Sequence, residues 1–329
     1  MDTVRAGVIG VGYLGRFHAQ KYAALPGVKL VGVADVNLEQ AQRVAGECGC
    51  LAYGDFRQLF AQVDAVSVVV PTSLHHMVAG ECLDAGLDVL LEKPMTVTLA
   101  EADDLLDKAS AGQRILQVGH LERFNPAVVA MKPFLTTPVF IESNRITTFK
   151  NRGVDVDVVL DLMIHDIDII LSIVDSPIQT IHTVGAPVAT ATTDIANARI
   201  IFANGATANV TVSRISRTNS RKMRIFQPGS YINVDFGNRR VMTIELSGEL
   251  RENGMPKQLV ELRSFTEGDA LLAEVSSFVE HVRQRSRPAV SGIEGRRALE
   301  VALQVINQIH QHQKLDLFKT LRSPKPSLP

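Results

Sequence analysis

The sequence predicts an α/β fold in which a doubly wound parallel sheet is followed by an α+β domain with a large, mostly antiparallel sheet. Three observations support this prediction. A glycine-rich turn joins an apolar strand to a helix near the N-terminus, strands and helices then alternate as far as residue 120, and from residue 139 onward short segments alternate apolar and polar residues.

The strand, turn and helix at the N-terminus carry the first functional signal. Residues 4–9 form a mostly apolar run, and Gly10-x-Gly12-x-x-Gly15 follows it. Gly10 permits a tight turn, Gly12 lets a pyrophosphate approach the backbone, and Gly15 lets helix and strand pack closely. The free N–H groups at the start of the helix then face the phosphates. A Rossmann dinucleotide site is therefore expected at Gly10, Gly12, Tyr13, Leu14 and Gly15.

A second apolar run, residues 29–34, ends in Asp35, twenty residues after Gly15. At this position a carboxylate can bind the two ribose hydroxyls of NAD. Neither Val36 nor Asn37 is the arginine that would accept a 2′-phosphate. NAD is therefore expected as the cofactor in preference to NADP. The alternative is that Asp35 only caps the helix predicted over 37–46.

Length and composition indicate an ordinary globular protein of two domains. The chain has 329 residues, 46% of them hydrophobic and 21% charged, with a formal net charge of −1. This balance does not suggest nucleic-acid binding. No apolar run approaches the length of a membrane span and no signal-peptide pattern precedes the first strand, so a cytoplasmic location without membrane partners is expected.

The three cysteines do not form a recognisable metal site. Cys48-Gly-Cys50 has no second Cys/His pair nearby to complete a zinc site, and Cys82 stands alone. We expect no metal, and interpret all three cysteines as reduced and structural. A redox role for Cys48 and Cys50 is the less favoured alternative.

The rest of the first domain continues the alternation up to residue 121. Helices are predicted over 38–46, 56–60, 74–85 and 98–111, and strands over 50–53, 65–70, 88–91 and 115–120. The carboxyl ends of such strands face the ligand crevice. The cofactor-binding residues expected there are Pro71, Thr72, His75, Glu92 and Lys93.

Lys93 is the most informative of these residues. A lysine directly after a buried strand is costly unless it is paired or directed at a ligand, and Pro94 fixes the backbone that directs it. His75 and His76 are adjacent and cannot share a helix face. One of them could contact cofactor or substrate, although helix packing or solvent exposure is the more common role.

The second domain is predicted over 122–315, with a proline-rich, disordered tail over 316–329. Its strands are expected over 139–148, 180–184, 195–202, 206–213, 222–227, 231–236, 241–245 and 258–265. Alternation with a period of two indicates a sheet with one solvated face. Helices are expected over 159–173, 270–284 and 293–311, and the last could pack on the first domain.

The helix over 159–173 carries candidate catalytic groups. Asp161 and His165 are four residues apart and Asp168 follows three later, so the three side chains are expected on one helix face. A histidine flanked by carboxylates on an apolar helix is either a satisfied core residue or a general acid/base. A nicotinamide site elsewhere in the chain favours the second interpretation.

Four motifs in order resemble the Gfo/Idh/MocA family of NAD(P)-dependent oxidoreductases. They are Gly10-x-Gly12-x-x-Gly15, Pro71-Thr72-x-x-His75, Glu92-Lys93-Pro94 and Arg123-Phe124-Asn125-Pro126. The resemblance covers nearly the whole chain and implies an active site between the two domains. It also implies a homo-oligomer, a dimer or tetramer, with the exposed sheet face of the second domain as the contact surface.

The resemblance also implies a mechanism. Asp161 and His165 match the family's Asp-x-x-x-His signature. His165 would take the proton from a secondary alcohol as hydride leaves the same carbon for the nicotinamide, Lys93 would stabilise the charge on the oxygen, and Asp161 would orient the imidazole or bind an adjacent hydroxyl. Many members have a glycine shortly after this aspartate, whereas this chain has Leu162 and Met163, which leaves the shape of the pocket open.

The implied substrates are sugars, cyclitols and nucleotide sugars. A basic run from Arg214 to Arg224, together with residues 119–126, resembles a subgroup proposed to oxidise the 3-hydroxyl of UDP-N-acetylglucosamine. Arg123, Asn125 and His165 are the expected substrate-binding residues. Arg123 could instead form an interdomain salt bridge, and the basic run could be a cationic sheet edge that discourages aggregation.

Two other functions compete with an NAD-dependent dehydrogenase. One is a glycosidase that retains NAD and uses transient oxidation to cleave a glycosidic bond. The other is a non-catalytic dinucleotide sensor with a protein partner. A sensor would have no use for Lys93 and His165 together, so their presence argues against it.

Overall fold

The computed structural model describes residues 3–149 and 156–314, so the predicted tail over 316–329 lies outside the described residues. The chain divides into two compact units, one formed by Met1–Asn125 with Glu267–Leu299 and the other by Pro126–Thr266 with Glu300–Pro329. The sequence placed all of residues 122–315 in the second domain. In the structure, the chain returns to the first unit after residue 266.

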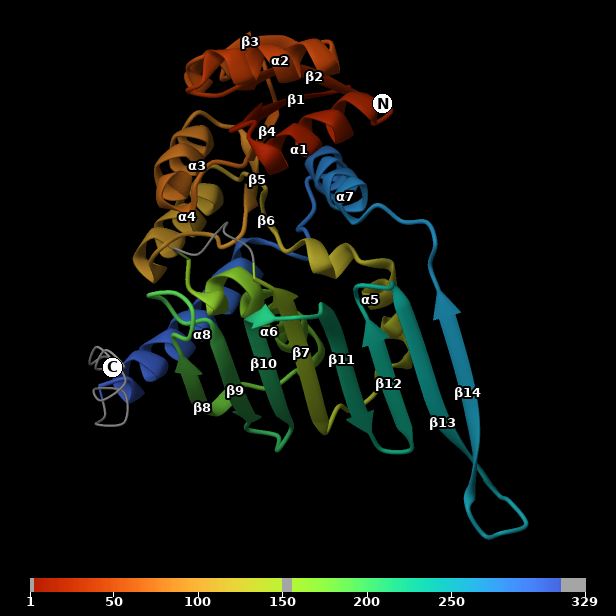
Figure 1. Ribbon diagram of the computed structural model, residues 1–329. Coiled ribbons are helices and arrows are strands. Elements are labelled where there is room, and N and C mark those ends of the chain that lie inside the picture. Colours follow the sequence, from red (N-terminus) through yellow and green to blue (C-terminus); the bar gives the residue numbers. More distant parts are fainter. Residues whose placement is uncertain (1–2, 150–155, 315–329) are drawn as a thin grey trace. The chain divides into compact units, whose positions relative to one another are not determined.

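The sheet of the first unit is entirely parallel, as predicted. Its strands follow the order β3-β2-β1-β4-β5-β6 (Figure 1). The strands are β1 (Val4–Ile9), β2 (Val28–Ala34), β3 (Leu51–Tyr53), β4 (Ala65–Val68), β5 (Asp88–Glu92) and β6 (Leu116–Gly119). The strand order reverses direction between β1 and β4, which is the point where doubly wound sheets bind ligands.

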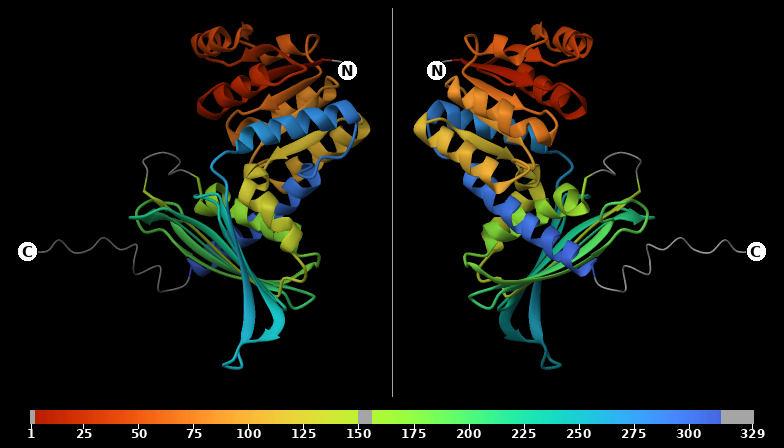
Figure 2. Two further views of the ribbon diagram at one scale, coloured as in Figure 1. Left: turned by 90° about the vertical axis from the view of Figure 1, so that its right-hand side faces the viewer. Right: turned by 90° about the vertical axis from the view of Figure 1, so that its left-hand side faces the viewer.

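Helices cover both faces of this sheet. They are α1 (Tyr13–Ala24), α2 (Leu38–Cys48), α3 (His75–Asp84), α4 (Leu99–Ala111) and α7 (Ala270–Gln284). α1 packs against α2 and α7, and α3 packs against α4 (Figures 1 and 2). Phe278 and Val279 of α7 are buried with Tyr22 of α1 in the same core. A helix from late in the chain therefore completes the apolar core of the first unit.

Shorter helical segments connect these elements. They are the 3₁₀ turns η1 (Phe56–Leu59), η2 (Thr72–Leu74) and η3 (Leu121–Phe124). The helix predicted over 56–60 is thus a single 3₁₀ turn, which Asp55 caps by accepting from the Arg57 N–H. α4 begins with the capping box formed by Thr98 and Glu101, which satisfies backbone donors that would otherwise lack partners.

The second unit contains an eight-stranded sheet in the order β14-β13-β12-β11-β7-β10-β9-β8. Its strands are β7 (Phe140–Thr148), β8 (Ile178–Ala186), β9 (Ile195–Phe202), β10 (Thr207–Ser216), β11 (Ser220–Gln227), β12 (Ser230–Asp235), β13 (Arg240–Leu250) and β14 (Pro256–Ser264). β7 and β10 are parallel, while the other neighbouring pairs are antiparallel. The predicted mostly antiparallel sheet is confirmed.

Helical segments cover part of this second sheet. α5 (Pro126–Met131) and the 3₁₀ turn η4 (Lys132–Phe134) precede β7, and a π-helical turn η5 (Val159–Met163) leads into α6 (Ile164–Ile173). α5 packs on β12 and β13, and α6 packs on β7 and β10. Buried and more exposed residues alternate along β9 and β10, as the period of two predicted. The boundary between the units falls inside α8 (Gly292–His312).

None of the helices within residues 3–149 and 156–314 combines the length and the apolar character needed to cross a bilayer.

Candidate active site

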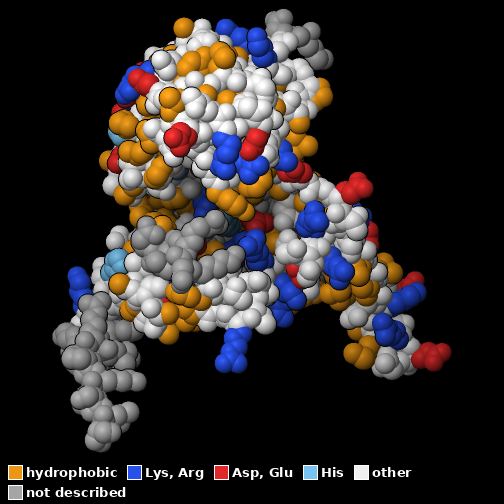
Figure 3. All heavy atoms as spheres, turned by 45° about the horizontal axis from the view of Figure 1, so that its top comes forward, with side chains coloured by type: hydrophobic (Ala, Val, Ile, Leu, Met, Phe, Trp, Pro, Cys, Tyr) orange, Lys and Arg blue, Asp and Glu red, His pale blue; other side chains and the backbone are white. Residues whose placement is uncertain are grey.

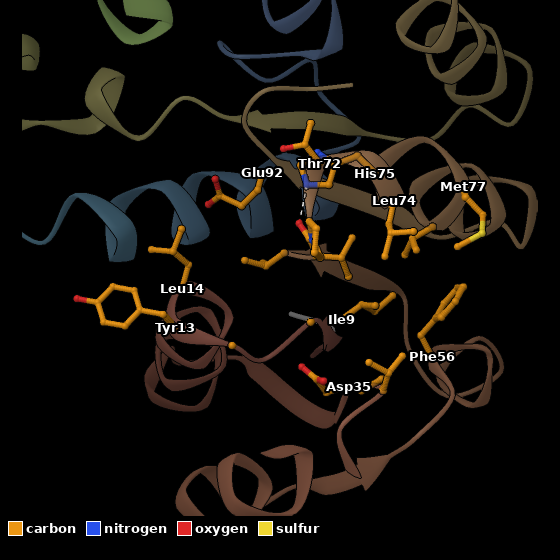
Figure 4. A pocket seen from close by; sticks show the side chains of 18 of the residues that line it. Ile9, Tyr13, Leu14, Asp35, Phe56, Thr72, Leu74, His75, Met77 and Glu92 are labelled. Atoms are coloured by element: carbon orange, nitrogen blue, oxygen red, sulfur yellow. Dashed lines mark hydrogen bonds between the residues drawn. The ribbon is translucent and has the colours of Figure 1, made fainter. Parts of the chain in front are cut away.

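A pocket of about 550 Å³ opens at the carboxyl ends of β1, β2, β4 and β5 (Figure 4). All but one of the predicted cofactor-binding residues line it. Those lining it are Gly10, Gly12, Tyr13, Leu14, Asp35, Pro71, Thr72, His75, Glu92 and Lys93. Gly15 is buried within α1 and does not line the pocket. Parallel strands bring these residues together because their carboxyl ends lie at one edge of the sheet.

The glycine turn has a separate physical requirement at each position. Gly10 has φ +82° and lies against the Val69 carbonyl, to which a Cβ would approach within 2.6 Å. A Cβ on Gly15 would lie 1.8 Å from the Gly10 carbonyl oxygen, so only glycine lets α1 start here. A Cβ on Gly12 would meet nothing within 4 Å. Gly12 is thus unnecessary for packing, and its position at the N-terminus of α1 fits the approach of a phosphate.

Alanine substitutions can separate these two requirements. Gly15→Ala is expected to lower the melting temperature, because the turn must open to relieve the overlap. Gly12→Ala is expected to leave the melting temperature of the free protein within about 2 °C while weakening NADH binding by about 10-fold or more. Calorimetry and fluorescence titration with NADH measure the two effects. Equal NADH affinity in Gly12→Ala and wild type would contradict the assigned role of Gly12.

Asp35 is held at the end of β2 by two backbone donors. One carboxylate oxygen accepts from the Val11 N–H and the other from the Asn37 N–H, both at 2.9 Å. The side chain that caps α2 is Asn37, which accepts from the Gln40 N–H. The alternative that Asp35 only caps this helix is therefore wrong. A fixed carboxylate in the pocket suits ribose hydroxyls and repels a 2′-phosphate.

Removing the charge of Asp35 is expected to reduce the preference for NAD over NADP. Asp35→Asn keeps one acceptor oxygen but loses charge-assisted hydrogen bonds, so NADH affinity should fall by about 10-fold while NADPH affinity stays equal or rises. Paired titrations with NADH and NADPH measure the ratio. Asp107→Asn, an exposed position on α4, is the control. An unchanged ratio in Asp35→Asn would contradict the prediction.

An apolar wall of the pocket was missed by the sequence analysis. Phe56, Leu74 and Met77 lie on the same side of the pocket in Figure 4. Leu74 and Met77 are 40% and 47% exposed, which is unusual for such side chains. An apolar slot beside the Asp35 carboxylate fits the flat ring of an adenine. Together with the glycine turn, this wall shows that the residues present fit a dinucleotide.

Glu92 lies at the opposite end of the pocket from Asp35 in Figure 4, and Lys93, the next residue in the chain, also lines the pocket. One oxygen of Glu92 accepts from the Lys93 backbone N–H at 3.1 Å, and the other lies 3.1 Å from Nε2 of His18. Burial raises the pKa of Glu92, but the hydrogen bond and charge of His18 and the charge of Lys93 outweigh it and lower that pKa. The Glu92 carboxylate is therefore ionised. Lys93 is half-buried, and its peptide bond to Pro94 is cis.

His75 and His76 both have structural partners. The ring nitrogens of His75 lie 2.9 Å from the carbonyl oxygens of Pro94 and Val70, and burial lowers its pKa. Its ring thus connects the backbone at Val70 with the backbone at Pro94. His76 pairs with Asp104 at 2.8 Å. These structural contacts account for both histidines, and a direct cofactor contact by His75 stays a prediction.

Asp161 and His165 lie at the junction of the π turn and α6 in the second unit. The wider π turn replaces the regular α-helix that the sequence predicted, and such turns are frequent at functional sites. Asp161 and His165 are half-exposed, whereas Asp168 is 3% exposed. The predicted polar face therefore offers two accessible groups, since Asp168 is buried.

A buried ion pair holds α6 on the sheet beside His165. Arg145 of β7 donates to both oxygens of Asp166, at 2.9 and 3.0 Å, and both side chains are almost fully buried. The guanidinium also lies over the ring of Phe236. Two parallel hydrogen bonds fix orientation as well as distance. Asp166, which directly follows the candidate base His165 in α6, is thereby anchored to the sheet.

The predicted substrate residues Arg123 and Asn125 lie at the end of the first unit. Arg123 donates to the Ala289 carbonyl at 3.2 Å, and Asn125 is 8% exposed and donates to Glu122. The Ala289 contact lies within the first unit. Substrate binding by Arg123 and Asn125 stays a prediction.

The basic run of the second unit is largely neutralised by ion pairs. Arg214 pairs with Asp194, Lys222 with Asp235 and Arg224 with Glu142. The run spans the end of β10 and the start of β11, which are both interior strands, so the interpretation of the run as a cationic sheet edge is wrong.

The cysteines are disfavoured as reactive thiols. Burial raises the pKa of Cys48 and raises the pKa of Cys50 to about 11, so little thiolate forms and the structural interpretation of these cysteines is favoured.

Comparison with known proteins matches both units. Residues 4–120 match the NAD-binding Rossmann model of the Gfo/Idh/MocA oxidoreductases, and residues 141–228 match the C-terminal domain model of the same group. UDP-N-acetylglucosamine 3-dehydrogenase of Acidithiobacillus ferrooxidans is 40% identical over 306 residues, which cover 93% of this chain and 97% of that protein.

Solved structures agree with these matches. A structure of the Acidithiobacillus ferrooxidans enzyme has a TM-score of 0.90 at 38% identity, covering 96% of this chain and all of that one. Levoglucosan dehydrogenase in complex with NADH has a TM-score of 0.84 at 17% identity, covering 94% of this chain and 97% of that one, and shows a shared fold.

Proposed function

The chain belongs to the Gfo/Idh/MocA oxidoreductase family, and on that premise we propose that it oxidises the 3-hydroxyl of UDP-N-acetylglucosamine with NAD. The proposed substrate rests on the 40% identity to a UDP-N-acetylglucosamine 3-dehydrogenase across 93% of this chain. The pocket with its glycine turn, Asp35 and Lys93 supports the cofactor and the reaction class.

The proposed chemistry divides between Lys93 and His165. Bound in the pocket, NAD would supply the acceptor for the hydride that leaves the carbon bearing the hydroxyl. Nζ of Lys93 donates a hydrogen bond to the substrate oxygen and stabilises its negative charge. The imidazole of His165 takes the hydroxyl proton, and Asp161 orients that imidazole. Arg123 and Asn125 are proposed to bind the substrate.

The test is NADH formation by the purified protein in a panel of substrates. UDP-N-acetylglucosamine is compared with UDP-glucose, free N-acetylglucosamine and myo-inositol, each with NAD and a hydrazine trap that removes the ketone. The expected result is one NADH for each UDP-N-acetylglucosamine consumed. Oxidation of only a free sugar or inositol would overturn the proposed substrate. Cleavage of a glycosidic bond without net NADH would favour the NAD-retaining glycosidase.

We also propose that the open face of β12–β14 binds a second copy of the chain. Val260 and Leu262 of β14 are 60% and 62% exposed. They pair with Ile244 and Met242 of β13, so these apolar side chains lie on one face. Figure 3 shows hydrophobic side chains among charged ones on this part of the surface. An apolar sheet face of this kind suits burial in a homo-oligomer.

A charge introduced on this face is expected to dissociate the oligomer. Leu262→Glu would place a carboxylate in a buried contact, which carries a large desolvation cost. Light scattering after gel filtration should show the wild type at two or four times the chain mass and the variant at the mass of one chain. Leu250→Glu is the control, because Leu250 is also exposed but lies at the hairpin end of β13, where it pairs with Pro256 beyond a shift in register. A monomeric wild type would contradict the proposal.

A cytoplasmic location is proposed on separate grounds. All three cysteines are free thiols, which is typical of proteins in a reducing compartment.

A further inference from the structure

A buried polar cluster adjoins the end of the pocket that contains Glu92 and Lys93, inside the first unit. It joins three titratable groups, His18 of α1, Glu92 of β5 and Glu274 of α7. One potential ligand atom from each lies within 4.8 Å of the others. His18 and Glu274 are 1% and 0% exposed. Of these three residues only Glu92 lines the pocket, so the roles of His18 and Glu274 need an explanation.

The hydrogen bonds of this cluster leave Glu274 without a partner among the described residues. His18 contacts Glu92 through Nε2 at 3.1 Å and the Ser67 hydroxyl through Nδ1 at 3.2 Å, and Ser67 in turn contacts the Tyr22 hydroxyl at 2.9 Å. Neither carboxyl oxygen of Glu274 accepts a hydrogen bond from a donor within residues 3–149 and 156–314, so a hydrogen bond here requires a proton on Glu274 itself, directed at the Glu92 oxygen within 4.8 Å. An ionised carboxylate in this position would be strongly unfavourable.

Within residues 3–149 and 156–314, no cationic side chain of the elements packed against α7 donates a hydrogen bond to Glu274. α1 contributes His18 and Tyr22, β5 contributes Glu92, and β6 contributes the neutral Gln117, whose amide donates to the Glu274 backbone carbonyl. η3 and β1 also pack on α7, and Arg5 of β1 is paired with Asp64. Glu122 accepts from Asn125, and Arg123 donates to Ala289. At the N-terminus of α7, Lys21 is paired with Asp269.

We infer that Glu274 is a protonated carboxylic acid that shares its proton with the Glu92 carboxylate and, together with His18, positions Glu92 beneath Lys93. The proposed arrangement involves only this hydrogen bond and no covalent change. Burial and the neighbouring charge of Glu92 raise the pKa of Glu274 well above its ordinary value, in agreement with this arrangement. Because Glu92 accepts from the Lys93 backbone N–H, its orientation fixes the backbone from which the lysine side chain extends.

The kinetic consequence rests on the proposed function, with Glu274 as a positioning residue that does not touch substrate. Glu274→Gln imitates the protonated acid and should keep kcat within about 3-fold of wild type. Glu274→Leu removes the hydrogen bond and should lower kcat by about 10-fold or more while the affinity for NADH stays within about 3-fold. Glu280→Gln, at an exposed position on the same helix, is the matched control.

Two measurements test the protonation state without any substrate. Infrared spectroscopy of the wild type at pH 7.5 should show the carbonyl band of a protonated carboxylic acid, and Glu274→Gln should lack it. A carboxyl group whose pKa is higher in the folded than in the unfolded protein stabilises the fold fully at a pH below its unfolded-state pKa of about 4.3. This stabilisation is lost as the pH rises through the folded-state pKa. The melting temperature of Glu274→Gln minus that of wild type should therefore increase with pH over this interval.

Several outcomes would overturn the inference. They are absence of the acid band in the wild type, its persistence in Glu274→Gln, a melting-temperature difference that falls with rising pH, or a kcat in Glu274→Gln as low as in Glu274→Leu. Stoichiometric binding of added Zn²⁺ or Mn²⁺ that Glu274→Gln abolishes would assign the cluster to a metal instead. If no substrate is turned over, the proposed function fails while the infrared and melting measurements still decide the state of Glu274.

Discussion

Replacing Lys93 with methionine is expected to lower kcat by about 100-fold to 1,000-fold while NADH affinity changes by less than about 3-fold. Methionine is close to lysine in length and lacks the ammonium group. The donor that stabilises negative charge on the substrate oxygen is therefore lost, and removal of one such donor costs about 10²–10³ in rate. Because this charge develops during the reaction, the loss falls on kcat more than on KM.

Steady-state kinetics and NADH titration of the same preparations measure this effect. Lys29→Met is the matched control, since Lys29 is an exposed lysine on β2 of the same unit. Turnover in Lys93→Met equal to that of Lys29→Met would remove Lys93 from the proposed mechanism. A large loss of NADH affinity would instead assign Lys93 to cofactor binding, which its place in the pocket wall also permits.

Replacing His165 with asparagine is expected to lower kcat by about 10²-fold to 10⁴-fold, the range typical of a lost general base. Asparagine keeps a polar group on α6 but cannot take the hydroxyl proton. The fall of kcat/KM on the acidic side of the pH profile, where the wild-type imidazole is protonated, should disappear in the variant. NADH affinity should be unchanged, because the dinucleotide pocket lies entirely in the first unit.

The control for His165 is His182→Asn, at an exposed position on β8. Added imidazole should restore part of the activity of His165→Asn if the lost function is proton transfer. An unchanged pH profile in His165→Asn would show that the acid/base group lies elsewhere. A loss of activity in His165→Asn that is accompanied by a lower melting temperature would favour the alternative that His165 is a core histidine.

The sequence predicted the dinucleotide end of the pocket because that end depends on short-range spacing. Gly10 and Asp35 each follow directly on a strand whose apolar run is visible in the sequence, Gly12 lies two residues after Gly10, and parallel strands necessarily end at one edge. The apolar wall with Phe56 and Met77 was not predicted. Phe56 lies in the short turn η1 and Met77 in the first turn of α3, where too few residues precede them to show a period, so nothing local distinguishes these side chains from core residues.

By itself, the sequence determined the class of both sheets, the glycine turn, the position of Asp35 and the delivery of Lys93 at the end of β5, since these follow from residue periods and turn chemistry. Only the tertiary structure decided that α7 belongs to the first unit and that Glu274 lies beside His18 and Glu92. The amphipathic pattern of a helix shows which of its faces is buried, but not which distant segment covers that face.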